Sequence, residues 1–220
     1  MSAALYPLFL NLQGRTCVVV GGDATAEAKT RDLLAAGARV SLISPTVTRQ
    51  IAEWSRAGTL RWKPRAYQEG DLADAFLAVS CAGAAFNARV FAECEERNMF
   101  CNAVDDVEHC NCYASAVVRR GPLQIAISTA GKSPALAQRL RKELEQQFSP
   151  EYASWVEKLG ELRGRLFDDE CIDPETRTAI LHEQASGSAF EAYKAQREKG
   201  AHPAKSEDCA GSKDSSSRGM

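Results

Sequence analysis

The feature that most constrains the fold is an apolar strand that ends at two glycines and leads directly into a helix-forming run. Residues 18–29 read Val-Val-Val-Gly-Gly-Asp-Ala-Thr-Ala-Glu-Ala-Lys. Glycine permits a tight turn and lets the backbone approach a ligand closely. The free N–H groups and the positive dipole end of the following helix favour a phosphate. The segment therefore predicts the first strand–turn–helix of a dinucleotide-binding fold.

The glycine turn departs from the usual fingerprint at one position. In the G-x-G-x-x-A spacing, Gly21 and Ala26 are the first and third members, but Asp23 takes the middle place. That place normally leaves room for a pyrophosphate. The acidic residue expected after the second strand is also missing, because Ser44-Pro45-Thr46 stands there and Arg49 is only nearby. The fingerprint alone therefore leaves NAD and NADP both open.

Strand and helix signals alternate over the first hundred residues. Such alternation implies an α/β, Rossmann-type parallel sheet that is covered on both faces. The predicted strands are Thr16–Val20, Arg39–Ile43, Leu60–Lys63, Phe76–Cys81 and Phe100–Val104, and the predicted helices between them are Ala24–Ala36, Thr48–Arg56 and Asn87–Asn98.

The pattern changes after Asp105. Two β-rich runs, Tyr113–Val118 and Leu123–Ser128, are joined by Arg119–Pro122 and predict a hairpin-like pair outside the main sheet. Because exposed strands need a partner edge, we expect a homodimer that pairs these segments. Three helices are predicted beyond them, at Pro134–Gln147 with Ser133 as N-cap, at Glu151–Leu166 and at Pro174–Lys199.

We therefore expect four parts along the chain. They are a Rossmann domain over residues 1–112, a small β-containing dimerisation and substrate segment over 113–149, a helical domain over 150–199 and a tail over 200–220. The tail is rich in Ser, Gly, Lys and Asp and has almost no apolar content, so we predict that it is disordered.

Composition excludes several classes of protein. The 220 residues suffice for one α/β domain and a smaller appendage, and the net charge of −2 does not favour nucleic acid or an anionic membrane as a partner. No apolar run approaches the roughly 20 residues of a membrane span. The N-terminus lacks the basic and apolar regions of a signal peptide, so the eight cysteines predict a reducing cytoplasm, with Cys17 and Cys81 as small buried hydrophobes.

Two segments carry candidate chemistry. Asp105 ends the fifth strand, at the edge where open α/β sheets bind ligands, and its carboxylate is placed to accept a proton; the alternative is a capping or loop aspartate. The loop Ser128–Ser133 precedes a helix N-terminus that suits substrate carboxylates, although an ordinary capped loop would look the same. Its Gly-Lys-Ser lacks the upstream glycine spacing of an NTPase, and we reject that function.

A third segment, His109-Cys110-Asn111-Cys112, lies near Cys101 in the sequence. Cysteines beside a histidine can bind a soft metal ion, but no second Cys-x-x-Cys pair completes a zinc site. We expect plain loop thiols and no metal.

From Tyr6 to Leu166 the chain resembles the precorrin-2 dehydrogenase/sirohydrochlorin ferrochelatase family, the N-terminal module of bacterial siroheme synthase. The resemblance rests on Tyr6–Leu12, on the glycine turn with Ala26–Lys29, on Asn102–Asp106 and above all on Ala116–Ala137. It departs from the family at Asp23, at Ala28 and in Ser128–Gly131, which is less rich in glycine.

The resemblance implies NAD⁺-dependent oxidation of precorrin-2 to sirohydrochlorin in siroheme synthesis, by a homodimer with Asp105 as the catalytic residue. Some relatives also insert Fe²⁺ as a second substrate. The implied cofactor contacts are Gly21, Gly22, Asp23, Ala24, Thr25, Pro45, Thr46, Cys81, Ala82 and Val104. The tetrapyrrole is a polycarboxylate, and its implied contacts are Arg119, Arg120, Ser128, Thr129, Gly131, Lys132 and Ser133.

Two other functions remain open at this point. One is an NAD(H)-sensing Rossmann module that has lost catalysis because of Asp23. The other is a chelatase without useful dehydrogenase activity, in which Asp105 would serve metal insertion.

Overall fold

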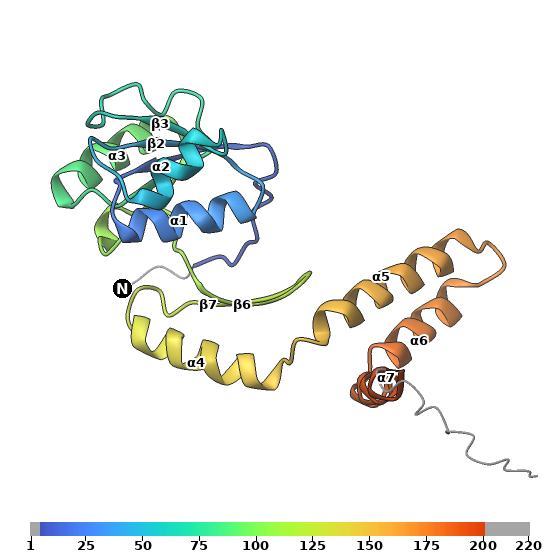
Figure 1. Ribbon diagram of the computed structural model, residues 1–220. Helices are drawn as coiled ribbons and strands as arrows, with labels where there is room; N and C mark the ends of the chain where they lie inside the picture. The colour runs from blue at the N-terminus through green and yellow to red at the C-terminus, as the bar shows by residue number, and fades with distance from the viewer. Residues whose placement is uncertain (1–4, 201–220) are drawn as a thin grey trace, which may run out of the picture. The chain divides into compact units, whose positions relative to one another are not determined.

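The computed structural model describes residues 5–200 (Figure 1). The chain divides into two compact units. The first holds the chain up to Val117 together with Ala126–Lys142, and the second holds Val118–Ile125 and the chain from Glu143 onward. The predicted disorder of residues 201–220 lies outside the described residues.

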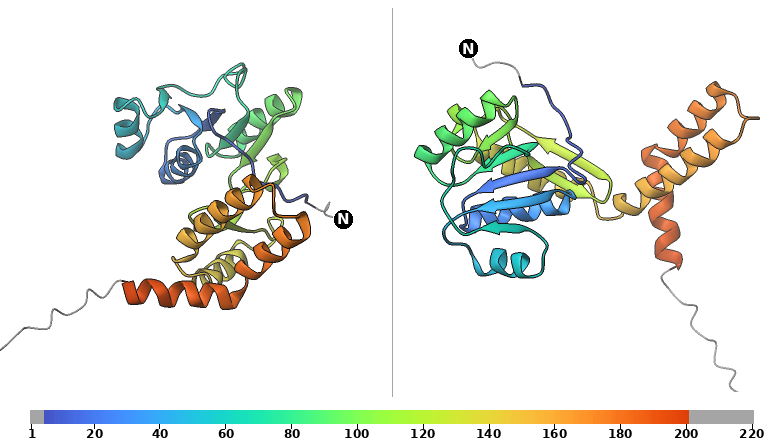
Figure 2. Two further views of the ribbon diagram at one scale, coloured as in Figure 1. Left: turned by 90° about the vertical axis from the view of Figure 1, so that its right-hand side faces the viewer. Right: turned by 90° about the horizontal axis from the view of Figure 1, so that it is seen from above.

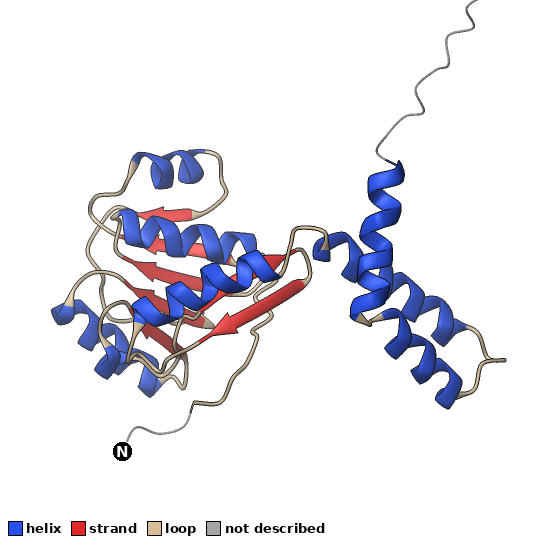
Figure 3. Ribbon diagram, turned by 90° about the horizontal axis from the view of Figure 1, so that it is seen from below, coloured by secondary structure: helices blue, strands red, loops and turns tan. Residues whose placement is uncertain are grey.

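The first unit is built on a parallel sheet of five strands in the order β3-β2-β1-β4-β5. Its strands are seen in red in Figure 3. They are β1 (Thr16–Val20), β2 (Arg39–Ile43), β3 (Arg61–Lys63), β4 (Leu77–Ser80) and β5 (Phe100–Ala103). Because β1 pairs with both β2 and β4, the chain reverses its direction of growth across the sheet at β1. The predicted Rossmann-type fold is confirmed.

Helices cover both faces of this sheet, as two further views show (Figure 2). Helices α1 (Ala24–Ala35) and α2 (Arg49–Arg56) pack on the face that Cys17 and Val19 present, and α3 (Ala84–Glu96) packs on the face of Val18 and Val20. Successive residues of β1 are thus buried on opposite faces, as expected for a strand in the middle of a covered parallel sheet. Cys17 is fully buried, as predicted, and burial raises the pKa of its thiol to about 11.

The connection from β3 to β4 contains no helix and is held by two carboxylates. Asp71 binds Arg65 and Lys63 at 2.6 and 2.9 Å, and these cations hold its pKa well below the usual range. Glu93 of α3 accepts hydrogen bonds from the Tyr67 hydroxyl and from the Gly70 and Leu72 backbone N–H groups. The loop is therefore ordered by charged groups in place of a packed helix.

The structure corrects several predicted boundaries in the sheet region. Helix α3 begins at Ala84 and not at Asn87, because Gly83, at a φ of +86°, starts it directly after β4. The hairpin strands are β6 (Ala116–Arg120) and β7 (Leu123–Ile127). The prediction that Arg119 and Arg120 form the connection was wrong, since both belong to β6 and only two residues form the turn.

The helices that follow are α4 (Pro134–Gln147), α5 (Tyr152–Asp168), α6 (Pro174–Gln184) and α7 (Gly187–Gly200). The helical region predicted over Pro174–Lys199 consists of two helices, α6 and α7. The chain breaks after α6, and the Ser186 hydroxyl accepts a hydrogen bond from the Ala189 N–H at 3.2 Å, which caps the start of α7. No helix within residues 5–200 is long and apolar enough to cross a bilayer.

The second unit has a small aromatic core. Tyr152 and Trp155 of α5 pack against Phe190 of α7, with ring centroids 4.1 and 4.8 Å from that of Phe190. Phe148 adds an edge contact to Tyr152. These rings hold the last helix onto α5.

The buried carboxylate of Glu93 generates a stability prediction. Burial by itself raises the pKa of this carboxyl, but hydrogen bonds from Tyr67, Gly70 and Arg97 outweigh it and keep the pKa below its ordinary value. Glu93→Gln leaves donors without a full set of acceptors, so we expect the unfolding free energy to fall by about 1–3 kcal/mol.

Urea denaturation measures that change, with Glu96→Gln on the exposed side of α3 as the matched control. Since the folded-state pKa of Glu93 is lowered, the wild-type advantage should be complete above about pH 4.3 and shrink as the pH falls further. Equal midpoints for both variants would contradict a structural role of Glu93.

Candidate active site

A cavity of about 570 Å³ opens at the carboxyl ends of β1, β4 and β5. Ligands of open α/β sheets bind at this edge, where the strand order reverses. The volume lies in the range of roughly 300–1,000 Å³ that is usual for small-molecule sites. The cavity is lined by Asp23, Thr25, Cys81, Gly83, Ala84, Asn87, Val104, Asp105, Asp106, Glu108 and His109.

The two glycines of the turn after β1 are required by contacts inside the protein. A Cβ on Gly21, whose φ is +126°, would lie 3.0 Å from the Cys81 carbonyl oxygen. A Cβ on Gly22 would lie 2.0 Å from the Thr46 carbonyl oxygen. The turn thus packs tightly between the loops that follow β4 and β2, and the predicted loop residues Pro45 and Thr46 lie exposed beside it.

Asp23 caps the helix that follows the turn. Its side chain accepts a hydrogen bond from the Ala26 N–H at 2.8 Å. The carboxylate is therefore bound to its own helix at the rim of the cavity, while Ala24 and Thr25 in the first turn stay exposed. A carboxylate at a helix N-terminus is locally favourable, but it occupies an amide that a phosphate would otherwise use.

A second helix start faces the same cavity. Helix α3 begins at Ala84, its N-cap residue Gly83 offers no side-chain cap, and a Cβ on Gly83 would meet open space. Its first backbone N–H groups are thus available to an anionic ligand. A dinucleotide fits this arrangement, since the cavity has the volume and one helix start, that of α3, is left uncapped for its phosphates.

Cys81 is only half-buried and lines the cavity, so the prediction that it is a buried core residue was wrong. Burial, together with the nearby carboxylates of Asp23 and Asp105, raises the pKa of its thiol to about 12. A neutral thiol offers no nucleophile here. Ala82 follows it, half-buried and packed against the core on the α3 side.

Asp105 and Asp106 follow β5 but have different environments. Asp105 is exposed to the cavity and has a φ of +58°, a left-handed conformation that is uncommon outside glycine. Among the described residues it makes no hydrogen bond or ion pair. Backbone strain of this kind is concentrated at functional sites, where the surrounding structure maintains it.

Asp106, in contrast, is fully engaged. It accepts a hydrogen bond from the Asn87 amide at 3.2 Å and lies 2.8 Å from Nδ1 of His109. Asn87 in turn accepts from the hydroxyl of the buried Ser80 at 2.6 Å. His109 and then Asn87 hold the pKa of Asp106 below its usual value, so this carboxylate stays ionised.

The cysteines near His109 have structural contacts. The thiol of Cys110 lies 3.1 Å from both the N–H and the carbonyl oxygen of Ala103, and the Asn111 side chain accepts from the Cys101 N–H at 2.7 Å. These bonds tie the segment after the short 3₁₀ helix η1 (Val107–His109) back onto β5. Within residues 5–200, no three histidine, cysteine or acidic side chains are grouped as metal ligands.

The serine-rich loop lies beside this segment. Ala130 and Gly131 both have positive φ values, +51° and +76°, and a Cβ on Gly131 would lie 3.1 Å from Val107. The hydroxyls of Ser128 and Thr129 accept from backbone N–H groups inside the loop. Ser133 caps α4 as predicted, with Lys132 exposed next to it. The structure thus brings this loop next to the turn that carries Asp105.

The two arginines of β6 belong to the second unit and differ in their contacts. The guanidinium of Arg120 donates to the carbonyl oxygens of Phe148 and Glu145 at 2.7 and 2.8 Å, which closes the C-terminal end of α4. Arg119 is exposed. Arg120 is therefore committed within the protein, and Arg119 is the arginine with a free surface.

Sequence reasoning did not assign Gly83, Ala84, Asn87, Glu108 or His109 to a ligand site, although all line the cavity. The signal for the first two was the strand-to-helix turn after β4, which adjoins the glycine turn in the sheet. Asn87, Glu108 and His109 could not be recognised in this way. They come together only when η1 folds back beside α3, and their spacing in the sequence does not indicate that fold.

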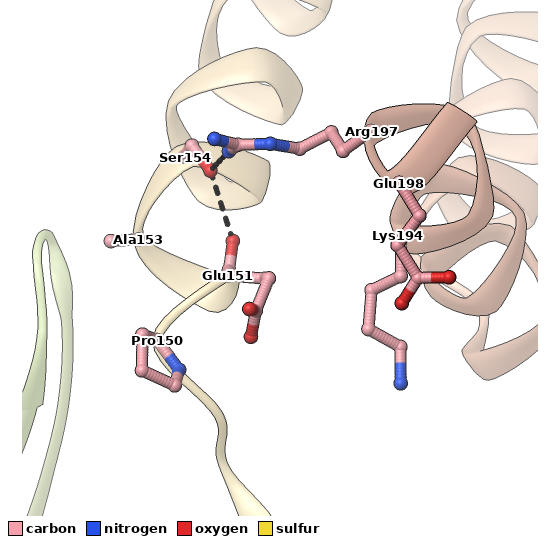
Figure 4. A pocket seen from close by; sticks show the side chains of 7 residues that line it. All are labelled: Pro150, Glu151, Ala153, Ser154, Lys194, Arg197 and Glu198. Carbon is pink, nitrogen blue, oxygen red and sulfur yellow. Dashed lines mark hydrogen bonds between the residues drawn. The ribbon is translucent and has the colours of Figure 1, made fainter. Parts of the chain in front are cut away.

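A further hollow of about 470 Å³ lies between α5 and α7 (Figure 4). Its two cations, Lys194 and Arg197, face two carboxylates, Glu151 and Glu198. The Ser154 hydroxyl is held by Arg197 and donates to the Glu151 carbonyl oxygen at 3.2 Å. Because its charges balance and its serine is engaged, this hollow is a weaker candidate than the cavity at the sheet edge.

Comparison with known protein families matches most of the described chain. Residues 8–116 match the family model described as "Putative NAD(P)-binding". Residues 120–147 match the model described as "Sirohaem biosynthesis protein central". The first match covers the whole parallel sheet, and the second covers the end of β6, β7 and α4.

Curated relatives are longer than this chain. A protein named siroheme synthase 2 from Yersinia enterocolitica is 34% identical over 162 residues, which are 73% of this chain and 34% of the relative. Siroheme synthase from Escherichia coli is 35% identical over 161 residues, again 73% of this chain and 35% of the relative. The chain thus spans about a third of the length of these relatives.

One solved structure matches nearly end to end. The protein titled SirC, precorrin-2 dehydrogenase, superposes with a TM-score of 0.72 at 27% identity, over 88% of this chain and 96% of the other. Both family models, the relatives and this structure agree with the motifs of the sequence. The chain belongs to the precorrin-2 dehydrogenase/sirohydrochlorin ferrochelatase family, which includes the N-terminal module of siroheme synthase.

Proposed function

We propose that this protein is an NAD-dependent dehydrogenase that oxidises precorrin-2 to sirohydrochlorin in siroheme biosynthesis. The observation that carries the proposal is the strained, exposed carboxylate of Asp105 in the cavity at the carboxyl edge of the sheet. The likeness to SirC, precorrin-2 dehydrogenase, over nearly the whole of that chain supports the same reaction.

The cofactor would be held by the turn from Gly21 to Thr25 and by the loops after β2 and β4, where Pro45, Thr46, Cys81 and Ala82 lie, with Val104 directly after β5. The uncapped start of α3 offers N–H groups for its phosphates. When bound, NAD⁺ supplies the hydride acceptor of the reaction.

Asp105 would accept the proton that leaves the substrate with the hydride, since it faces the cavity without a competing partner among the described residues. The substrate carboxylates would be held by Lys132 and by the loop residues Ser128, Thr129, Gly131 and Ser133. Arg119 is exposed on β6, in the second unit, whereas Arg120 would act by holding the end of α4.

Replacing the proton acceptor tests this assignment. We expect Asp105→Asn to bind NAD⁺ nearly as tightly as the wild type but to oxidise precorrin-2 at least about a hundredfold more slowly, because an amide cannot accept the proton. Absorbance at the product band measures the rate, and Asp74→Asn in an exposed loop is the control. An unchanged rate would exclude Asp105 as the base and make Asp106 the next residue to test.

The same purified protein separates the dehydrogenase from its alternatives. Oxidation of precorrin-2 with NAD⁺ supports the proposal. Insertion of Fe²⁺ or Co²⁺ into sirohydrochlorin without NAD⁺, with no oxidation, would identify a chelatase in its place. Binding of NAD⁺ with neither reaction would identify a sensing module.

Asp23 gives a prediction about cofactor affinity. A carboxylate about 4–6 Å from a pyrophosphate costs on the order of 1–3 kcal/mol, and 1.4 kcal/mol is one decade in affinity. We expect Asp23→Gly to tighten NAD⁺ binding about tenfold, with a small loss of helix stability. Asp23→Asn keeps a capping side chain without the charge and should give most of the same gain.

Calorimetric titration with NAD⁺ compares the three proteins. Weaker binding by both variants would mean that the Asp23 carboxylate is a ligand of the cofactor, in place of the acid missing after β2. A gain in the glycine variant alone would mean that the bulk of the side chain matters more than its charge.

We further propose a homodimer that joins through the hairpin. A sheet of two strands leaves β6 and β7 each with an open edge, and such a sheet is marginal alone. Sedimentation at micromolar concentration should give twice the chain mass of 23.9 kDa. A single species of one chain mass would rule out the dimer.

A cytoplasmic location agrees with the thiols. We propose this location because all seven described cysteines are free, and free thiols are usual in a reducing compartment.

A further inference from the structure

His109 shares the cavity with Asp105 and is held by a carboxylate of its own. Its Nδ1 lies 2.8 and 2.9 Å from the two oxygens of Asp106. The imidazole is 30% exposed, and its edge packs against Phe91 with ring centroids 5.8 Å apart. The ring is thus fixed on one side and open to the cavity on the other.

A chain of hydrogen bonds fixes which nitrogen of His109 carries the proton. The buried Ser80 hydroxyl donates to the Asn87 side-chain oxygen, and the Asn87 amide donates to Asp106. Both oxygens of the Asp106 carboxylate lie within hydrogen-bonding distance of Nδ1 and can only accept, so Nδ1 is the nitrogen of His109 that carries the proton. Nε2 is then left as the basic nitrogen, as in other aspartate–histidine pairs.

The backbone separates the roles of the two consecutive aspartates. Asp105, in its left-handed conformation, lines the cavity, while the Asp106 side chain turns toward Asn87 and His109. One turn later, η1 returns His109 to the same cavity. The Asp105 carboxylate and the His109 imidazole, which can each accept a proton, therefore line one space.

The reaction leaves a proton on Asp105 in every cycle, and that proton must depart before the next. Asp106 is committed to two partners and Asp23 to the Ala26 N–H, which leaves Glu108 and His109 as the other proton acceptors of the lining. Imidazole can accept a proton at one ring nitrogen and release it again, which suits a carrier between a carboxyl group and water.

We propose that His109, positioned by Asp106, relays the substrate proton from Asp105 to solvent. This inference rests on the proposed dehydrogenase function. The Asp105 carboxyl O–H bond breaks and the His109 Nε2–H bond forms, directly or through one water molecule. The imidazolium then gives that proton to bulk water, while Nδ1–H stays bound to Asp106. No electrons move in this step, and one proton is released per turnover.

Kinetics on the full chain with precorrin-2 and NAD⁺ test the relay. We expect His109→Ala and Asp106→Asn each to lower kcat at least about tenfold with little change in KM, and the double variant to be no slower than the slower single one, since the pair acts as a unit. Added imidazole should restore much of the His109→Ala rate in a saturable way. His182→Gln, on exposed α6, is the matched control.

Rescue by imidazole distinguishes a relay from a structural role. If His109 were only structural, free imidazole would not restore the kcat of His109→Ala. An unchanged kcat in His109→Ala, or a loss that imidazole does not recover, overturns the relay. If the wild type oxidises precorrin-2 and the variants match it, only the relay fails. If the wild type itself gives no oxidation, the proposed function and the relay fail together.

A second measurement needs neither substrate nor a stable variant. Nitrogen-15 spectra of the histidine rings in the wild type should show neutral His109 as the Nδ1–H form. The Nε2–H form would overturn the relay, because the basic nitrogen would then face Asp106 and not the cavity.

Discussion

The pairing of β1 with β2 on one side and β4 on the other is the constraint on which the rest of the structure depends. It places the starts of α1 and α3 at one edge and separates them by a single strand spacing. The cavity exists because the chain runs outward from β1 through β2 and β3 and then returns to place β4 on the other side of β1. The groups after β5 then close that cavity, since β5 is the next strand outward.

Much of this architecture was predictable because a parallel strand buried on both faces is a continuous apolar run, and Val18–Val20 is one. The wrong predictions concern boundaries that the local sequence does not determine. Nothing in Tyr113–Arg120 shows where pairing with β7 begins, and the break at Ser186 depends on a serine that also suits a helix surface. The start of β6 is set by its pairing with β7, and the position of α7 by the contacts of Phe190 with Tyr152 and Trp155.

The site was predictable in part for the same reason. Asp105 could be singled out because it ends a strand at the ligand-binding edge. Its positive φ and the bonds of Asp106 could not, since they arise only when η1 folds back onto Asn87. The sequence correctly indicated that another group lies close to the backbone of these glycines. At Gly22 that group is the Thr46 carbonyl of the protein itself and not a ligand.

The chain passes between its two units three times, at the boundaries 117/118, 125/126 and 142/143. A fold threaded in this way has no single cut point that yields either half intact. The nucleotide-binding part and the helical part must therefore be inherited, transplanted or fused as one block. A gene rearrangement can add a new activity to this protein without dividing either unit only if the junction lies outside residues 117–143. Outside that range the backbone does not pass from one unit to the other.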